Sequence, residues 1–221
     1  MNDKKESGSR IGLAIFVANL IISLVTYPML PERIIIHWGA GGTPDGYSSK
    51  LYGFLLMQLV QVFVLGIYYV LPRIDPQGKL KVSTGYFSNT MNLLLVYFTF
   101  FNVLFIAQNL GYEFNMTRVV VPGVGIMLYF LGHFMSKAER NWFYGIRTPW
   151  TLSSDEVWRS THEKAGLLFK VCGVIAILSV LVPEYSIWMV VLPIIFTGLY
   201  IVGFSYYEFR KTGNDSLYQS K

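Results

Sequence analysis

The first of two histidine clusters offers side chains that could act as metal ligands or as an acid–base pair. His37 lies eight residues before Asp45, with Glu32 on one side and Ser48 on the other. Structural zinc takes four protein ligands and catalytic zinc takes three plus water, so His37 and Asp45 alone do not make a metal site. We therefore expect a hydrogen bond between them that holds the surrounding loop folded, with no metal and no cofactor.

The second cluster surrounds His162, which has Glu163 beside it and Asp155 two helical turns before it. A catalytic site needs a nucleophile, a base and an orienting group within reach of one another. Neither HExxH nor GxSxG accompanies either histidine, so no catalytic residue is expected, although a membrane enzyme is kept as a rival interpretation. The favoured role of His162 is a hydrogen bond to a carbonyl group or a contact that holds Trp158.

His162 lies in a polar, aromatic-rich segment between two apolar stretches, residues 137–166, which we name the signature segment. Its first half interleaves cations with aromatic rings, as membrane-interface belts do. Gly145 permits a bend and Pro149 fixes φ, and hydroxyl side chains at Thr148 and Thr151 flank that proline. An interfacial belt explains the composition but not this spacing, which indicates that Arg147 is presented between two turns.

The second half of the signature segment has the pattern of a helix start. Ser153 and Glu156 are spaced as a capping box. Helical spacing then places Trp158, His162 and Ala165 on one face. We expect this helix to continue through residue 166 into the next apolar stretch, so that a change in the loop could move a transmembrane helix.

These loops must be positioned by membrane helices. Of the 221 residues, 53% are hydrophobic and only 14% are charged, against about 25% charged in a soluble domain. Long continuous apolar runs satisfy their backbone hydrogen bonds in lipid as helices. The predicted fold class is an all-α integral membrane protein with six transmembrane helices: Ile11–Leu30, Leu51–Leu71, Met91–Leu110, Val119–Met135, Leu167–Val182 and Ser186–Tyr207.

The distribution of cations predicts the orientation of these helices. With a cytoplasmic N-terminus, the inside segments hold 15 Lys and Arg residues and the outside segments hold three, so both termini are expected in the cytoplasm of a multi-pass plasma-membrane protein. The net charge of +5 then favours anionic lipid over nucleic acid as a neighbour. The inside cations are Lys4, Lys5, Arg10, Arg73, Lys79, Lys81, Lys137, Arg140, Arg147, Arg159, Lys164, Lys170, Arg210, Lys211 and Lys221, and the outside ones are Arg33, Lys50 and Arg118.

Two further connections complete the predicted topology. The outer loop, residues 31–50, is rich in glycine, and we expect an extended run at Ile34–Ile36 and a turn at Pro44-Asp45-Gly46. Its aromatic residues Trp38 and Tyr47 are expected at headgroup depth. The inner loop, residues 72–90, lacks a helical period and is expected to be a solvated basic turn.

Polar residues inside the predicted spans leave a transporter or channel as the alternative function. Gln58, Gln61, Asn92 and Asn102 are amides, whereas ion and proton paths usually carry carboxylates. Amides within spans more often bond one helix to another. Cys172, the one cysteine, is expected to be a small buried residue.

The two polar loops carry a resemblance to known families. The residues of the signature segment that carry it are Asn141, Gly145-Ile146-Arg147-Thr148-Pro149-Trp150-Thr151-Leu152-Ser153, Val157-Trp158 and Thr161-His162. Those of the outer loop are Pro31, His37, Gly42, Pro44-Asp45-Gly46 and Lys50. By these residues the signature segment resembles that of the SdpI family, and the outer loop resembles the DUF1648 domain that often precedes it. With six helices, the resemblance covers nearly the whole chain.

This resemblance implies a division of the chain. Residues 1–10 and 208–221 are cytoplasmic tails, residues 11–71 a DUF1648-like helical hairpin with the outer loop, and residues 91–207 an SdpI-like four-helix region.

The resemblance also implies a membrane immunity protein that protects a cell from a secreted killing peptide of the SDP type. It further implies recruitment of a helix-turn-helix repressor on the cytoplasmic side. Candidate repressor or relay contacts are Asn141, Gly145, Arg147, Thr148, Pro149, Trp150, Trp158, Thr161 and His162. Candidate outer contacts with the peptide are His37, Trp38, Asp45, Tyr47 and Lys50.

Overall fold

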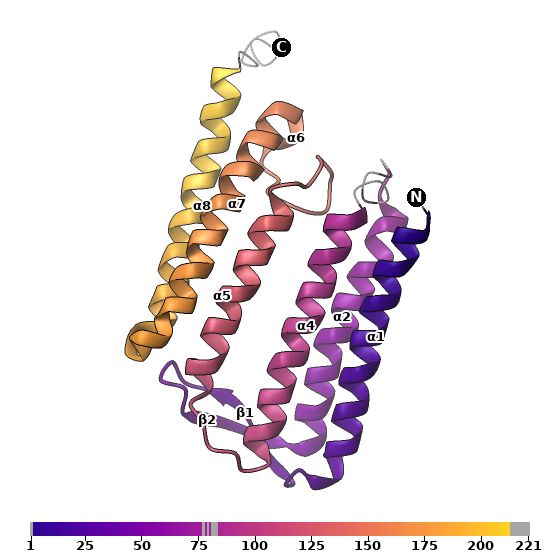
Figure 1. The fold of residues 1–221 in the computed structure, drawn as a ribbon, viewed down its shortest axis with the longest axis vertical. Coiled ribbons are helices and arrows are strands. Elements are labelled where there is room, and N and C mark those ends of the chain that lie inside the picture. The colour runs from indigo at the N-terminus through magenta and orange to yellow at the C-terminus, as the bar shows by residue number, and fades with distance from the viewer. Residues whose placement is uncertain (1, 77, 79, 81–83, 213–221) are drawn as a thin grey trace.

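A computed structural model describes residues 2–76, 78, 80 and 84–212 of the chain. Within them, six helices are long and apolar enough to cross a membrane, as predicted (Figure 1). They are α1 (Asn2–Thr26), α2 (Lys50–Ile74), α4 (Thr84–Asn109), α5 (Met116–Met135), α7 (Asp155–Leu178) and α8 (Ser186–Lys211). The connections hold the strands β1 (Arg33–Trp38) and β2 (Pro44–Ser49), the short helix α6 (Pro149–Ser153), and 3-10 turns at Tyr27–Met29, Ser179–Leu181 and Pro183–Tyr185.

The helices extend beyond the apolar runs that predicted them. α2 passes through Pro72 and ends at Ile74, and α4 begins at Thr84, so the expected loop over residues 72–90 is too long at both ends. Hydropathy detects only the part of a helix that lies in hydrocarbon, whereas polar turns continue the same backbone ladder outside it. The cations expected at positions 79, 81 and 221 lie outside the described residues.

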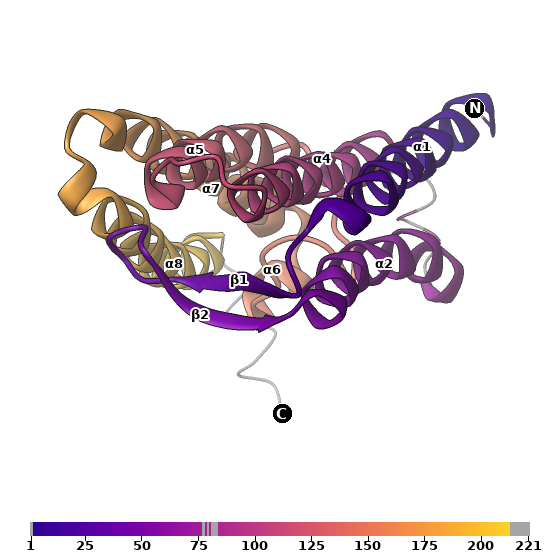
Figure 2. The ribbon, with the colours of Figure 1, turned by 90° about the horizontal axis from the view of Figure 1, so that it is seen from below.

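The six helices form two groups of three, α1, α2 and α4 on one side and α5, α7 and α8 on the other, which meet where α4 packs on α5 (Figure 2). The start of α1, the end of α8 and α6 all lie at one end of the bundle, and the two strands lie at the other (Figure 1). We call these the α6 end and the hairpin end. Assignment of the α6 end to the cytoplasm rests on the distribution of cations.

A ring of buried polar side chains joins the first group of helices. Asn19 Nδ2 on α1 donates to Gln58 Oε1 on α2 at 3.1 Å, and Gln58 Nε2 donates to Ser23 Oγ at 3.0 Å. Asn102 Nδ2 on α4 donates to Asn19 Oδ1 at 2.8 Å and to Ser23 Oγ at 2.9 Å. The expectation that the span amides bond helix to helix is confirmed at Gln58 and Asn102, and the ring replaces hydrogen bonds that lipid cannot offer.

The second group of helices is joined by glycines. α5 and α7 make the most extensive helix contact in the described chain, and Gly125 and Gly132 on α5 face Gly173 and Gly166 on α7. A Cβ on Gly132 would lie 2.5 Å from the carbonyl oxygen of Gly166, and one on Gly125 would lie 2.6 Å from that of Gly173. Only residues without a side chain allow backbones to approach this closely.

The outer loop is a β-hairpin that crosses the end of the bundle from α2 towards α8 (Figure 2). The extended run at Ile34–Ile36 is confirmed, but the turn expected at Pro44-Asp45-Gly46 is wrong, because these residues begin β2. The chain instead reverses between Gly39 and Thr43, with Gly42 at φ +78°. Gly46 lies opposite His37, where a Cβ would be 2.7 Å from the histidine Cβ, so this glycine serves close strand pairing.

Two asparagines fasten the hairpin to both helix groups. Asn109 at the end of α4 accepts from the backbone N–H of Ile35 at 2.7 Å and donates to its carbonyl oxygen at 3.1 Å. Asn115, the N-cap of α5, donates to the Gly41 carbonyl at 2.6 Å. The hairpin is therefore attached to α4 and α5, one helix from each group.

Candidate functional site

The first half of the signature segment is folded around Asn141, whose side chain is 2% exposed. Its Oδ1 accepts from the backbone N–H groups of Phe143 and Tyr144 at 2.8 and 2.6 Å. Its Nδ2 donates to the carbonyl oxygens of Glu139 and Tyr144 at 2.8 and 2.9 Å. Asparagine side chains readily mimic a turn of backbone in this way. Asn141 thus gives the loop one shape.

Gly145 brings the loop onto the face of α7 that carries His162. The glycine has φ +109°, and a Cβ there would lie 2.4 Å from His162 Nε2. The next backbone N–H, that of Ile146, donates to the same nitrogen at 2.9 Å. Close approach and a left-handed backbone both demand glycine at this position.

His162 and Trp158 form a buried stack under the loop. Their rings are 4.0 Å apart between centroids and nearly parallel, and both side chains are almost fully buried. Because Nε2 accepts from Ile146, the ring proton lies on Nδ1, which donates to the Trp158 carbonyl at 2.8 Å. The predicted carbonyl hydrogen bond of His162 is confirmed. Nε2 thus holds the loop on α7, and Nδ1 fixes the ring by a bond within the helix.

A short helix follows the turn and carries its own cap. Pro149 occupies the first turn of α6, and the Thr148 and Thr151 side chains exchange hydrogen bonds with each other's backbone N–H at 3.2 and 3.0 Å. The capping box expected at Ser153 and Glu156 is therefore wrong: Ser153 ends α6, and α7 is capped by Ser154, which accepts from Val157 N–H at 3.4 Å. Pro149 favours a helix start at its own position, so α6 forms before the site where the capping box was predicted.

The described loop also contacts helices beyond α5 and α7. Thr148 Oγ1 lies 3.1 Å from Ser205 Oγ on α8, and the Trp150 ring lies 5.0 Å from that of Tyr206. Thr161, also in the predicted set, is fully buried on α7, and its Oγ1 has no partner within the described residues. The signature segment thus gathers three helices of the second group.

Tyr144, which the sequence did not single out, connects the signature segment to the first helix group. Its hydroxyl lies 2.9 Å from Thr90 Oγ1 on α4, and its ring packs edge-on against Phe87. Burial raises the pKa of the Tyr144 hydroxyl, and its hydrogen bond with Thr90 partly offsets that rise. The hydroxyl stays protonated at neutral pH and joins the two helix groups at the α6 end.

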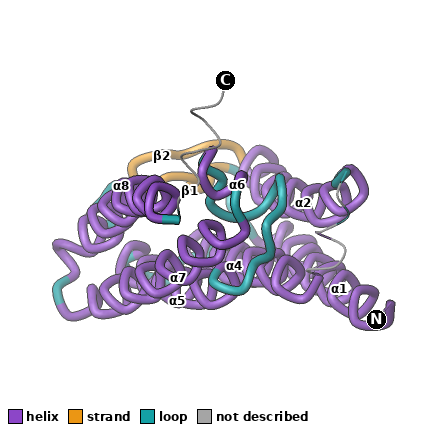
Figure 3. Tube along the Cα trace, turned by 90° about the horizontal axis from the view of Figure 1, so that it is seen from above, coloured by secondary structure: helices purple, strands orange, loops and turns teal. Residues whose placement is uncertain are grey.

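Arg147 is presented on this ordered loop, as the spacing predicts. The side chain is exposed, and its Nη1 donates to the Trp142 carbonyl at 2.6 Å. Trp142 is itself 49% exposed. Figure 3, which looks onto the α6 end, shows the loop between α5 and α7 lying across the centre of that end. Arg147 and Trp142 therefore offer a cation and an aromatic ring where a soluble partner could reach them.

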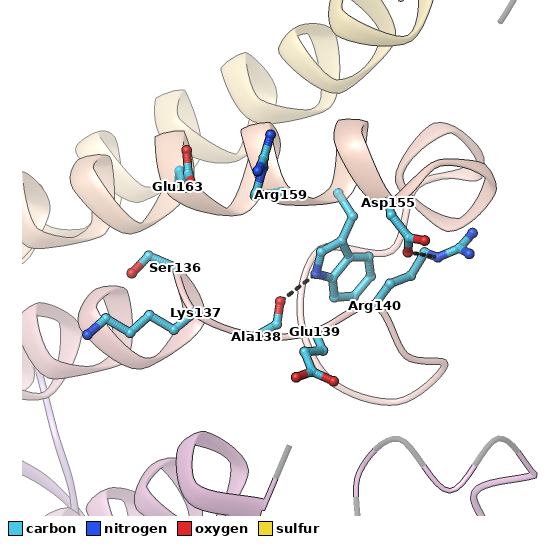
Figure 4. Close-up of a pocket in the computed structure, with 9 residues that line it drawn as sticks. Ser136, Lys137, Ala138, Glu139, Arg140, Asp155, Arg159 and Glu163 are labelled. Carbon is cyan, nitrogen blue, oxygen red and sulfur yellow. Dashed lines mark hydrogen bonds and ion pairs between the residues drawn. The ribbon is translucent and has the colours of Figure 1, made fainter. Parts of the chain in front are cut away.

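A groove of about 510 Å³ opens beside the loop (Figure 4). Trp158 forms one wall and donates from Nε1 to the Ala138 carbonyl at 2.7 Å. Arg140 forms another, held by Asp155 at 2.6 Å and by the Leu152 carbonyl at 2.6 Å. Cations and carboxylates alternate along the rest of the groove: Lys137, Glu139, Arg159 and Glu163.

At the opposite end of the bundle, the expected hydrogen bond in the hairpin is present. His37 Nδ1 lies 2.5 Å from Asp45 Oδ1, with both side chains exposed. Lys50 pairs with Glu32 at 2.9 Å. Among the residues that the structure describes, no three His, Cys, Asp or Glu side chains form a group that could hold a metal ion.

The two aromatic residues of the hairpin differ in their surroundings. Trp38 packs edge-on against Phe101 and Phe105 of α4. Tyr47 is half-exposed beneath the guanidinium of Arg33. Trp38 thus fixes the hairpin on the bundle, and Tyr47 is the aromatic residue accessible from outside.

Comparison with known proteins identifies the family of this fold. Residues 137–207 match the model of the SdpI/YfhL protein family, and residues 14–62 match a domain of unknown function, DUF1648. The chain is 33% identical over 207 residues to the Immunity protein SdpI of Bacillus subtilis (strain 168), covering 93% of this chain and 97% of that protein. No solved structure matches. The chain therefore belongs to the SdpI/YfhL family, as a multi-pass protein of the plasma membrane.

Proposed function

We propose that this protein protects its cell from a secreted peptide toxin of the SDP type. The observation that carries the proposal is the similarity to a protein named for immunity, which extends over both polar loops and all six helices. The buried ring of amides on α1, α2 and α4 serves helix contacts, which favours immunity over the transporter alternative.

We further propose that the signature segment relays toxin binding to a helix-turn-helix repressor in the cytoplasm. The candidate residues then take two roles. Asn141, Gly145, Trp158 and His162 position the loop by buried hydrogen bonds and stacking. Arg147, exposed on that loop, contacts the partner. A rigid loop that displays one cation is suited to recognition because little side-chain order is lost on binding.

The relay would travel along α7. This helix runs without a break from Asp155, beside the loop, to Leu178 near the hairpin end. Its glycine contact with α5 leaves no side chains interlocked between the two backbones at Gly132 and Gly166. A shift at one end of α7 would therefore reach the other as a rigid-body movement. Hydrogen exchange that revealed a flexible break near Gly166 would contradict this link.

The proposal of immunity is tested by survival. A sensitive bacterium expressing the chain is challenged with the SDP-type peptide and, in parallel, with unrelated membrane-active peptides; cells with empty vector are the control. Selective survival against the SDP-type peptide is the expected result. Equal killing of both strains by every peptide would overturn immunity.

A further inference from the structure

A hollow of about 370 Å³ lies under the β-hairpin, at the end of the bundle opposite the signature segment. Its walls come from four elements: the hairpin from His37 to Ala40, Phe101 of α4, the first turns of α5, and Ile187 of α8. The hollow therefore touches both three-helix groups. α5 extends from this hollow to the groove beside the signature segment. Ser136 and Lys137, which follow directly after α5, line that groove.

The interior and the mouth of the hollow differ in chemistry. Apolar side chains form most of the interior: Trp38, Phe101, Met116, Val120, Val121 and Ile187. His37 lines the hollow, and its Nδ1 lies 2.5 Å from Asp45 Oδ1, so Asp45 stands beside the lining residues at the mouth. The second carboxylate oxygen of Asp45 is close to Gly39, where a Cβ would lie 3.2 Å from it. A negative group thus stands at the edge of an apolar cavity.

We propose that this hollow is the toxin-binding site, and that it receives an apolar side chain of the secreted peptide next to a cationic group held by Asp45. The assignment rests on the proposed immunity function. An apolar cavity favours an aliphatic or aromatic side chain, and a carboxylate at the rim favours a neighbouring lysine, arginine or free amino group. The N–H and carbonyl of Gly39 are used within the turn, and Ala40, which also lines the hollow, offers the backbone that can bond a peptide main chain.

An acyl chain of a lipid with an amine headgroup is the competing occupant. The peptide is favoured because Ala40 presents backbone groups beside the carboxylate, and an acyl chain has no amides with which to bond them. A peptide bound here would also contact Phe101 and Ile187 on opposite helix groups. Its arrival would change how α4 and α5 are held together, and α7, which packs along α5, would carry that change to the α6 end.

Photo-crosslinking in whole cells tests the site. Val120, a half-buried residue of the hollow, is replaced by benzoylphenylalanine, and the cells are irradiated with the SDP-type peptide. The matched control carries the same group at Trp188, which is 58% exposed on α8 beside Ile187. Adducts are identified by mass spectrometry. We expect a peptide adduct at position 120 and none above background at position 188.

The Asp45→Asn change is then added to the position-120 chain. Loss of one exposed charge contact should lower the adduct yield about 2- to 5-fold, with unchanged topology. A lipid adduct, no adduct, or equal adducts at both positions would overturn the site. Survival, scored in parallel with cells that carry the unsubstituted chain, separates the two proposals. Protection without a peptide adduct refutes the hollow alone, and an adduct without protection refutes immunity alone.

Discussion

Replacement of Gly132 by alanine is expected to force α5 and α7 apart. The new Cβ would lie 2.5 Å from the carbonyl oxygen of Gly166, and 3.1 Å from the backbone nitrogen of Lys170. Carbon–oxygen contacts between helices normally measure about 3.3–3.6 Å, so the backbones must separate locally by about 0.8–1.1 Å. Phe169 Cβ lies 2.9 Å from the same position, and none of these atoms is the far end of a flexible side chain that could move away. Overpacking of this kind costs about 1–3 kcal/mol.

Thermal unfolding of the purified protein in detergent measures this cost. The matched control is Gly66→Ala on α2, where an added Cβ has nothing within 4 Å. Because alanine is the better helix former, the control should unfold at the same temperature or slightly higher. Gly132→Ala should unfold at a clearly lower temperature. Equal stability of the two variants would refute the idea that backbone contact sets the distance between α5 and α7.

Three other changes probe the signature segment and the polar ring. Arg147→Ala should leave membrane abundance unchanged yet abolish protection or signalling, as survival and reporter assays would show. Arg159→Ala, at a second exposed arginine of the segment, should preserve both. Loss of the Arg147→Ala protein from the membrane fraction would instead make the residue structural. Gly145→Ala should lower the unfolding temperature more than Gly111→Ala, because both glycines have positive φ but only Gly145 would clash, with His162; equal shifts would show that backbone strain alone matters. Asn102→Leu removes two buried hydrogen bonds and should cost about 0.6–2 kcal/mol of helix association. Solute flux in proteoliposomes should not change, because the amide serves helix packing. Lost flux would favour the transporter hypothesis.

Helices were predictable from this sequence because an apolar run long enough to cross a membrane is visible in each segment by itself. A run such as Ser186–Tyr207 needs no partner to be recognised, since the backbone in hydrocarbon must bond to itself. The second strand, Pro44–Ser49, was missed for the opposite reason. It has no β-branched residue and is extended only because Ile34 and its neighbours pair with it.

Contacts between segments far apart in the chain could likewise not be predicted from local sequence patterns. The glycines of α5 and α7 are more than thirty residues apart, and nothing near Gly132 indicates that Gly166 will face it. Thr148 was recognised as a flanking hydroxyl but not as a helix cap. That role depends on the helix that Pro149 begins. Tyr144 looked like one aromatic residue of a belt, and only the packing of α4 makes it a connection.

The polar ring has a consequence for the order in which the protein is built. α1 and α2 emerge from the ribosome before α4, and Asn19, Gln58 and Ser23 already bond one another across that pair. The pair leaves Asn19 Oδ1 and Ser23 Oγ as acceptors, and these are the atoms to which Asn102 donates. Biogenesis of this group can thus proceed by addition, with α4 meeting acceptors that α1 and α2 have already positioned. Cross-links formed during synthesis should join α1 to α2 before either is joined to α4.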